Sequence, residues 1–210
     1  MRYPPEQKAE TRRAILEAAG RVFRRRGYQG GGVDAVMKEA GLTHGGFYAH
    51  FRNKEALLGE AVLDAMWAMR EEHGRWTEGE SGEGWVRAFV DGYVSRGHVA
   101  AVEGGCPVPT LVSELGRVKE GPRESFERGL AVWAGDVAEQ LEGPETEREA
   151  MAMGVIASCV GAIALARAVA DETVADRVLA GARELVMAAV KGMTDEASVA
   201  GAEEVGDESV

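Results

Sequence analysis

Residues 32–58, GVDAVMKEAGLTHGGFYAHFRNKEALL, decide how the N-terminal part of this chain is organised. The apolar residues that follow Gly32 recur at helical spacing and form one stripe: Val33, Val36, Met37 and Ala40. Gly41 comes next, and glycine is the usual residue where a helix ends in a left-handed conformation. A short helix followed by a tight turn is therefore predicted.

A second short helix is predicted from His44 to about His50. Thr43 stands before it and is a good N-cap, because its hydroxyl can accept a backbone N–H from the first turn. Phe47 and Phe51 are four residues apart, so both point inward. The residues left outside are His44, Gly45, Tyr48 and His50.

A third helix is predicted from Lys54 to about Trp76, with Asn53 as its cap. Lys54 lies at the positive end of this helix, where a cation is unfavourable unless an anion such as phosphate docks there. The alternative is a solvated surface lysine. Two short helices joined by a tight turn, followed by a capped third helix, are typical of a helix-turn-helix that reads DNA.

At this point the chain resembles the TetR family of bacterial repressors. The resemblance is specific over about residues 10–60 and includes a preceding helix from Thr11 to about Arg26, with its apolar face inward. The matching motifs are residues 33–36 (VDAV), 40–43 (AGLT), 47–51 (FYAHF) and 53–57 (NKEAL). The resemblance implies an all-α fold: a three-helix helix-turn-helix domain, then a larger helical domain for ligand binding and dimerisation. It also implies a homodimer that binds a palindromic operator in double-stranded DNA.

Two departures from the family pattern affect the DNA-contacting residues. Gly32 stands where the family usually has Ser or Thr, so it offers only a backbone N–H. The reading helix carries Gly45 and Gly46 and no Arg or Lys, so base contacts are expected from Thr43, His44, Tyr48 and the N-terminal arm. The full set of expected DNA contacts is Arg12, Arg13, Gly32, Thr43, His44, Gly45, Gly46, Tyr48, His50 and Lys54.

The charge distribution agrees with DNA binding at one end of the chain. The net charge is −11, yet residues 1–54 hold 11 Lys/Arg and 5 Asp/Glu, a net +6. The remainder holds 13 and 30, a net −17. A basic module on an acidic body is expected where only one end touches DNA.

Four segments are predicted along the 210 residues. They are a disordered arm over 1–9, the helix-turn-helix domain over 10–56, a helical body over 57–192, and a disordered acidic tail over 193–210. Within the body, helices are expected over about 85–99, 110–115, 122–142, 145–169 and 174–191. No strand signal occurs.

Residues 150–166 carry no charge over 17 positions, which approaches the length of a membrane span. Small and polar residues interrupt the run, so we expect a close-packed dimer-interface helix in a cytoplasmic protein without a membrane or signal segment. The alternative is packing inside the monomer. The expected interface residues are Gly154, Ala157, Ser158, Gly161, Ala162 and Leu165.

Aromatic and methionine side chains gather in the body, where they could line the pocket of a small, largely apolar inducer. Such residues at helical spacing are more often plain core, so this alternative stays open. With the cysteine considered below, the candidate pocket residues are Met66, Met69, Trp85, Phe89, Tyr93, Cys106, Phe126 and Trp133.

Cys106 follows Glu103-Gly104-Gly105 and precedes Pro107, at a predicted loop near a helix N-terminus. This environment favours a reactive thiolate, and some TetR-type regulators that sense electrophiles or oxidants have a Gly-Cys at a similar place. A thiol-based sensor is therefore the alternative to a reversible inducer. A buried, inert cysteine is the other interpretation.

No enzyme, metal site or cofactor is expected. The histidines are His44, His50, His73 and His98, and none forms a metal pair at helical spacing. The chain contains no HExxH, GxSxG, phosphate-binding loop or paired-cysteine motif. A binding module that acts through protein partners, with a vestigial helix-turn-helix, remains a rival. Steep salt dependence of DNA binding would distinguish these classes.

Overall fold

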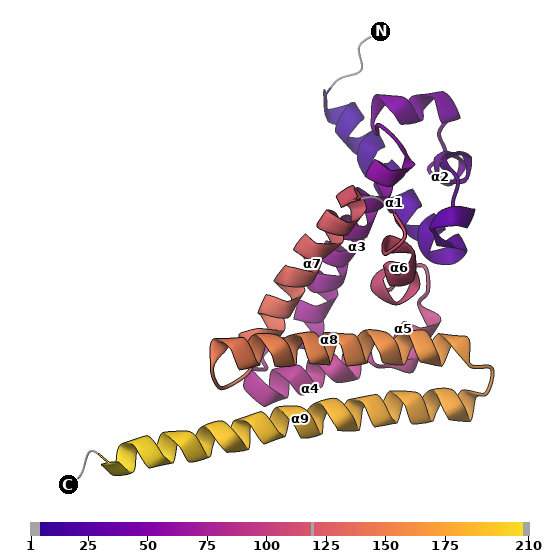
Figure 1. Cartoon of the computed structure of the whole chain (residues 1–210). Coiled ribbons are helices and arrows are strands. Elements are labelled where there is room, and N and C mark those ends of the chain that lie inside the picture. The colour runs from indigo at the N-terminus through magenta and orange to yellow at the C-terminus, as the bar shows by residue number, and fades with distance from the viewer. Residues whose placement is uncertain (1–4, 119, 208–210) are drawn as a thin grey trace. The chain divides into compact units, whose positions relative to one another are not determined.

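The computed structural model describes residues 5–118 and 120–207, and every regular element in those ranges is helical (Figure 1). The all-helical class predicted from the sequence is confirmed. In chain order the elements are α1 (Pro5–Gly30), α2 (Val33–Glu39), the 3₁₀ helix η1 (His44–Ala49), α3 (Lys54–Trp76), α4 (Gly82–Tyr93), α5 (Arg96–Ala100), α6 (Val108–Leu115), α7 (Glu120–Ala138), α8 (Glu145–Ala168) and α9 (Glu172–Asp207).

The chain divides into two compact units. The first contains residues 1–71 and 101–130, and the second contains residues 72–100 and 131–210. The sequence predicted consecutive domains with a single boundary near residue 56. The structure instead returns α6 and the first part of α7 to the N-terminal unit.

The first unit is built around α1, which packs against α2 and α6. The five residues predicted to face inward on α1 are all fully buried: Ile15, Ala18, Ala19, Val22 and Phe23. Gly27 adopts a φ of 70° and kinks α1 at the point where the sequence predicted its end. These buried side chains fix the platform on which α2 and η1 lie.

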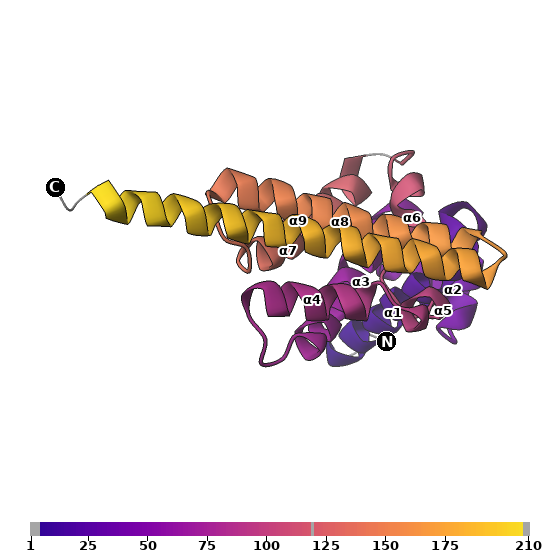
Figure 2. The same cartoon turned by 90° about the horizontal axis from the view of Figure 1, so that it is seen from below.

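The second unit contains a long antiparallel pair, α8 and α9, which lie side by side in both views (Figures 1 and 2). Helix α4 packs against α9, and α5 packs against α8. The apolar face of α4 points into the unit, because Val86, Phe89, Val90 and Tyr93 are fully buried. By length and composition alone, α8 could cross a membrane. This is weak evidence for a membrane span, because a core helix passes the same test, and 39% of the apolar window of α8 is buried within the structure.

The helix predicted over residues 85–99 is divided in two, which is a correction. The backbone leaves the helical region at Val94, and Ser95 then caps α5 by accepting the His98 N–H at 3.2 Å. Arg183 of α9 donates to the Val94 carbonyl at 2.6 Å. A serine cap and a partner for the freed carbonyl therefore stabilise the break.

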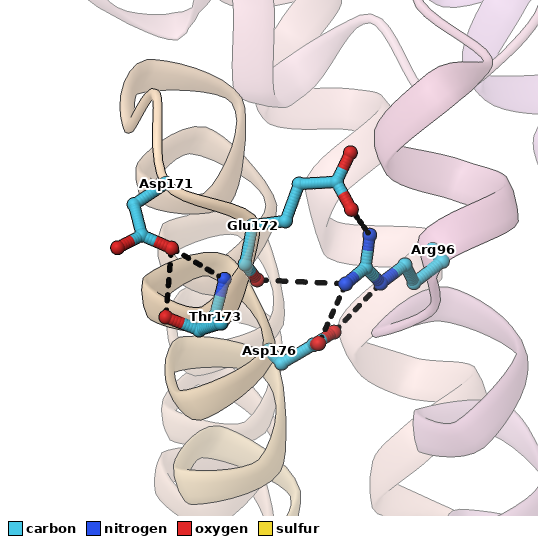
Figure 3. Close-up of polar contacts among 5 residues, drawn as sticks. All are labelled: Arg96, Asp171, Glu172, Thr173 and Asp176. Carbon is cyan, nitrogen blue, oxygen red and sulfur yellow. Dashed lines mark hydrogen bonds and ion pairs between the residues drawn. The ribbon is translucent and has the colours of Figure 1, made fainter.

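Arg96, at the start of α5, is held by two acidic residues of α9 (Figure 3). Its guanidinium donates to Asp176 at 2.6 and 2.5 Å and to the Glu172 carboxylate at 3.2 Å. The hydrogen bonds from Arg96 lower the pKa of Asp176. Asp171 caps the same end of α9 through the Thr173 N–H at 2.8 Å. These contacts fix α5 to the beginning of α9.

Both ends of the chain are more helical than the sequence predicted. The expected disordered arm is helical from Pro5, since proline suits the first turn of a helix. The expected disordered tail is also wrong for residues 193–207, because α9 continues through Asp207. Alanine and glutamate are frequent there and favour helix. Residues 1–4 and 208–210 lie outside the described residues.

Candidate DNA-binding site

The turn between α2 and η1 has the geometry of a Schellman motif. Gly41 has a φ of 70°, its N–H donates to the Lys38 carbonyl at 3.1 Å, and the Leu42 N–H donates to the Met37 carbonyl at 2.8 Å. The glycine signal read from the sequence is confirmed. This turn fixes the direction in which the chain enters η1.

The element expected to read DNA, η1, is a 3₁₀ helix, where the sequence predicted an ordinary short helix. Thr43 stands at its N-cap without a side-chain capping hydrogen bond, which corrects the capping role expected for its hydroxyl. Phe47 and Phe51 are buried and stack with ring centroids 5.8 Å apart, as the inward prediction required. The buried aromatic pair therefore fixes η1 on the interior of the first unit.

Most of the side chains predicted to touch DNA on η1 face solvent. Thr43, His44 and Gly45 are exposed, and Tyr48 is 66% exposed even though its ring lies edge-on to Phe47 at 5.2 Å. Gly46 and His50 are half-buried, and a Cβ on Gly46 would lie 3.6 Å from Met37. Thr43, His44 and Tyr48, which the sequence predicted to contact bases, are therefore accessible to a partner.

His50 is less suited to DNA than its neighbours. Its Nδ1 is buried and has no hydrogen-bond partner among the described residues. Burial lowers the pKa of His50, and Lys8 and Arg12 lower it further. A neutral, half-buried imidazole is therefore favoured at this position.

Gly32 occupies the N-cap of α2 in an extended conformation, and its carbonyl accepts the Val36 N–H at 3.1 Å. A Cβ built on Gly32 meets nothing within 4 Å, whereas one on Gly31 would lie 2.6 Å from the Phe23 ring. The close approach of backbone to aromatic ring thus requires glycine at position 31. Position 32 is free to carry a side chain.

Lys54, the expected phosphate ligand, already has partners within its own unit. Its Nζ donates to the Tyr28 carbonyl and lies 4.1 Å from the centroid of the Tyr28 ring. Burial lowers the pKa of Lys54, and Glu114 opposes that shift. Lys54 therefore ties the beginning of α3 to the end of α1, a role that the sequence did not indicate.

The two arginines near the start of α1 differ in availability. Arg12 pairs with Glu60 and lies 4.7 Å from the centroid of the Phe51 ring, so it helps to hold α3 and the segment between η1 and α3. Arg13 pairs along its own helix with Glu17 at 2.9 Å, and its side chain is 81% exposed. Arg13 is consequently the better placed of the two for a phosphate.

A set of contacts that the sequence did not indicate joins α6 and the loop before it to the last turns of α1. From α1, Arg24 donates to the Glu103 carbonyl of that loop at 2.5 Å, and Arg25 pairs with the Glu103 carboxylate at 2.9 Å. Within α6 itself, Glu114 accepts the Tyr28 N–H at 2.5 Å. No local motif marks Glu114, since its partner is distant in the sequence.

The candidate pocket residues fall into two groups. Met66, Met69, Cys106 and Phe126 belong to the first unit, and Trp85, Phe89, Tyr93 and Trp133 belong to the second. Within the second unit Trp85 stacks on Phe89 at 5.5 Å, and Trp133 lies 5.5 Å from Tyr93. His73, to which the sequence analysis gave no role, is buried among these rings at 4.9–5.9 Å.

A separate groove of about 720 Å³ lies in the second unit, on α7 and the beginning of α8. Ala134, Ala138 and Met153 line it together with Glu139 and Glu149. None of the eight residues proposed from the sequence lines this groove. A pocket prediction based on aromatic content alone therefore misses this groove.

The expected interface residues of α8 differ in exposure. Gly154 and Ala157 are exposed, and Leu165 is 58% exposed. Ser158 and Gly161 are half-buried. Ala162 is only 4% exposed, so it packs within its own chain and is not available to a partner, which corrects that part of the prediction. Met153 and Leu185, absent from the predicted set, are exposed at 43% and 65%.

Two segments of the chain match models of known protein families. Residues 15–61 match "Bacterial regulatory proteins, tetR family", and residues 82–182 match "Tetracyclin repressor-like, C-terminal domain". The chain is 31% identical over 135 residues to the HTH-type transcriptional regulator LmrA of Bacillus subtilis, which covers 63% of this chain and 71% of LmrA.

Solved structures share the fold. A TetR transcriptional regulator from Chloroflexus aurantiacus superimposes with a TM-score of 0.72 at 25% identity, over 89% of this chain and 96% of that one. The HTH-type transcriptional repressor NemR of Escherichia coli is 30% identical over 125 residues, which covers 57% of this chain and 61% of NemR. Reduced NemR shares the fold with a TM-score of 0.69 at 19% identity, over 83% of this chain and 96% of that structure. The chain belongs to the TetR family of DNA-binding transcriptional regulators.

Proposed function

We propose that this protein is a cytoplasmic, ligand-responsive repressor that binds a palindromic operator as a homodimer. The observation that carries the proposal is an exposed group formed by the N-cap Thr43 and by His44, Gly45 and Tyr48 of η1. The buried rings of Phe47 and Phe51 fix this group on the first unit. This group belongs to the basic N-terminal segment, whose positive charge would attract duplex DNA. The name of NemR as a repressor supports repression over activation.

Dimerisation is supported by the exposed apolar residues of α8 and α9. Leu165 and Leu185 are more than half exposed, and the glycine and alanine residues near them permit close approach of backbones. An isolated monomer would leave these side chains in water, so we expect a second copy of the chain to bury them. Two reading elements would then meet half-sites about one DNA turn apart.

A reversible inducer is supported by the aromatic group in the second unit. Trp133 is 5% exposed, and its Nε1 has no hydrogen-bond acceptor among the described residues. A largely apolar ligand that carries one acceptor atom would satisfy this donor. Such a ligand would release DNA only as far as it prefers the released conformation, through a tilt of α3 that changes the half-site spacing.

Footprinting on DNA from upstream of the protein's own gene tests the proposal, because such regulators often control themselves. We expect a protected palindrome that disappears as salt is raised. A folded dimer that protects no such sequence at low salt, either there or in a genomic library, would contradict operator binding.

A thiol sensor without a reversible ligand is the second candidate. Cys106 lies two residues before α6, and α6 carries the Glu114 carboxylate that holds the Tyr28 N–H of α1. A modified thiol would therefore disturb a helix that contacts the DNA-binding module. Cys106 is 1% exposed, so reaction requires local opening.

N-ethylmaleimide distinguishes the two candidates. Release of wild-type protein from DNA and no release of Cys106→Ser would support the sensor. Cys159→Ser is the matched control, because burial raises the pKa of Cys159 to about 12 and keeps that thiol inert. Equal release of wild type and Cys106→Ser would exclude Cys106 as the sensor.

A further inference from the structure

Asp34 is an exposed carboxylate close to the residues expected to read DNA. It is the second residue of α2, and its side chain is 86% exposed. A negative charge at such a place repels phosphate, so a surface built only for affinity would not carry it. Its contact with a neighbouring side chain gives it another role.

His44, the first residue of η1, is the partner of Asp34. Its Nδ1 lies 2.5 Å from Asp34 Oδ1, and its side chain is 50% exposed. Tyr48 lies edge-on to the imidazole with ring centroids 6.0 Å apart. The imidazole is therefore positioned by α2 on one side and by η1 on the other.

The protonation of the ring follows from this contact. An ionised carboxylate can only accept hydrogen bonds, so the Nδ1 atom must carry the proton that it donates to Asp34. In a neutral imidazole the other nitrogen, Nε2, is then an acceptor. In the major groove, the donors that an acceptor can read are the amino groups of cytosine and adenine, N4 and N6.

We propose that Asp34 is a positioning residue that fixes the Nδ1–H tautomer of His44, so that Nε2 accepts a hydrogen bond from a base amino group in the operator. The proposal rests on the proposed function, because it assigns one base contact within the operator. It gives the glycine-rich reading element a specific recognition group that needs no arginine or lysine. It also accounts for an acidic side chain on a basic module.

The tautomer is tested without DNA by ¹⁵N NMR of the full-length protein labelled at its imidazole rings, at pH 7.5. His44→Gln identifies the signal. We expect the wild-type His44 proton on Nδ1 and a shift toward Nε2 in Asp34→Ala. Glu10→Ala, which removes another exposed carboxylate of the same module, should leave the tautomer unchanged. A proton on Nε2 of wild-type His44, or no shift in Asp34→Ala, would overturn the proposal.

Base preference is tested by selection from a random-sequence duplex pool with the same proteins. Wild type and Glu10→Ala should enrich adenine or cytosine at one position of each half-site. Asp34→Ala should lose about tenfold of that preference and keep the others. An identical preference in Asp34→Ala would overturn the assignment of Asp34, whereas the absence of any enriched palindrome with wild type would overturn both the operator and the base contact.

Discussion

Adjacent glycines in this chain have different physical roles. Gly31 and Gly32 look alike in the sequence, yet only a Cβ on Gly31 would enter the space of the buried Phe23 ring. The Gly27 carbonyl would lie 3.1 Å from the same Cβ, so neither neighbour can easily move. Glycine is thus required for packing at one position and is replaceable at the next.

Gly31→Ala should lower the free energy of unfolding by about 1–3 kcal/mol, because overpacking forces a buried ring to move. Gly32→Ser should change it by less than about 0.5 kcal/mol, or raise it, since serine is a good N-cap. Urea unfolding monitored by circular dichroism measures both. Equal effects of the two substitutions would contradict the close contact between residue 31 and the Phe23 ring.

His98 makes stability depend on pH. It is 6% exposed, and its Nδ1 contacts the Tyr93 carbonyl at 2.8 Å. Burial lowers the pKa of His98, the hydrogen bond to Tyr93 partly opposes this shift, and Arg167 lowers the pKa further. The unfolded chain binds a proton near pH 6.5, and the folded chain resists it. The stabilisation is therefore present above about pH 6.5 and is lost as the pH falls toward the folded pKa.

Between pH 7 and 5 the wild-type free energy of unfolding should fall more steeply than that of His98→Gln. The glutamine amide can still donate to the Tyr93 carbonyl but does not titrate. The difference in slope should not exceed about 1.4 kcal/mol per pH unit. Parallel pH profiles from thermal unfolding would mean that His98 does not titrate in this range.

At the scale of elements, local signals predicted the helix-turn-helix well. The Gly41 turn and the helix from Lys54 to Trp76 are confirmed, and Asn53 caps that helix by accepting the Ala56 N–H at 2.7 Å. The end predicted near Gly27 is present as a kink, after which α1 continues to Gly30. Each of these depends on residues within one or two turns. Local sequence therefore contains the information that defines them.

The structural features that the sequence did not predict depend on residues far apart in the chain or on competing local signals. Tyr28 joins Lys54 and Glu114 to the end of α1, and no spacing rule links those positions. The break at Val94 depends on Arg183, which is far along the chain. The tail combines high acidity, which favours disorder, with a high helix propensity, and the helix propensity prevails in residues 193–207.

Glu114→Ala tests whether α6 stabilises the end of α1. The partly buried Tyr28 N–H would lose its acceptor, at a cost of about 1 kcal/mol. Hydrogen exchange should accelerate at Tyr28 and in the following residues. Ser113→Ala, an exposed neighbour on α6, is the matched control. Equal protection of Tyr28 in both variants would contradict the contact.

For the molecule as a whole, the proposed reading of an operator depends on self-association. In an interface between two identical copies, a substituted charge is present on both copies, and the two like charges repel each other. Leu165→Glu should therefore convert the dimer to a folded monomer and weaken DNA binding. Light scattering after size exclusion measures the mass. Val112→Glu, which changes an exposed apolar residue of α6, should remain dimeric. A Leu165→Glu dimer would remove α8 from the interface.

In the proposed function, the exposed face of η1 reads DNA while basic residues around it bind phosphate. The most direct measurement is the affinity of wild type and Tyr48→Ala for the footprinted duplex across a series of salt concentrations. We expect log K to fall linearly with log salt, by roughly 0.9 per phosphate contacted. Tyr48→Ala should bind more weakly with the same slope, because Tyr48 is exposed and uncharged. Unchanged affinity in Tyr48→Ala, or binding insensitive to salt, would contradict the account.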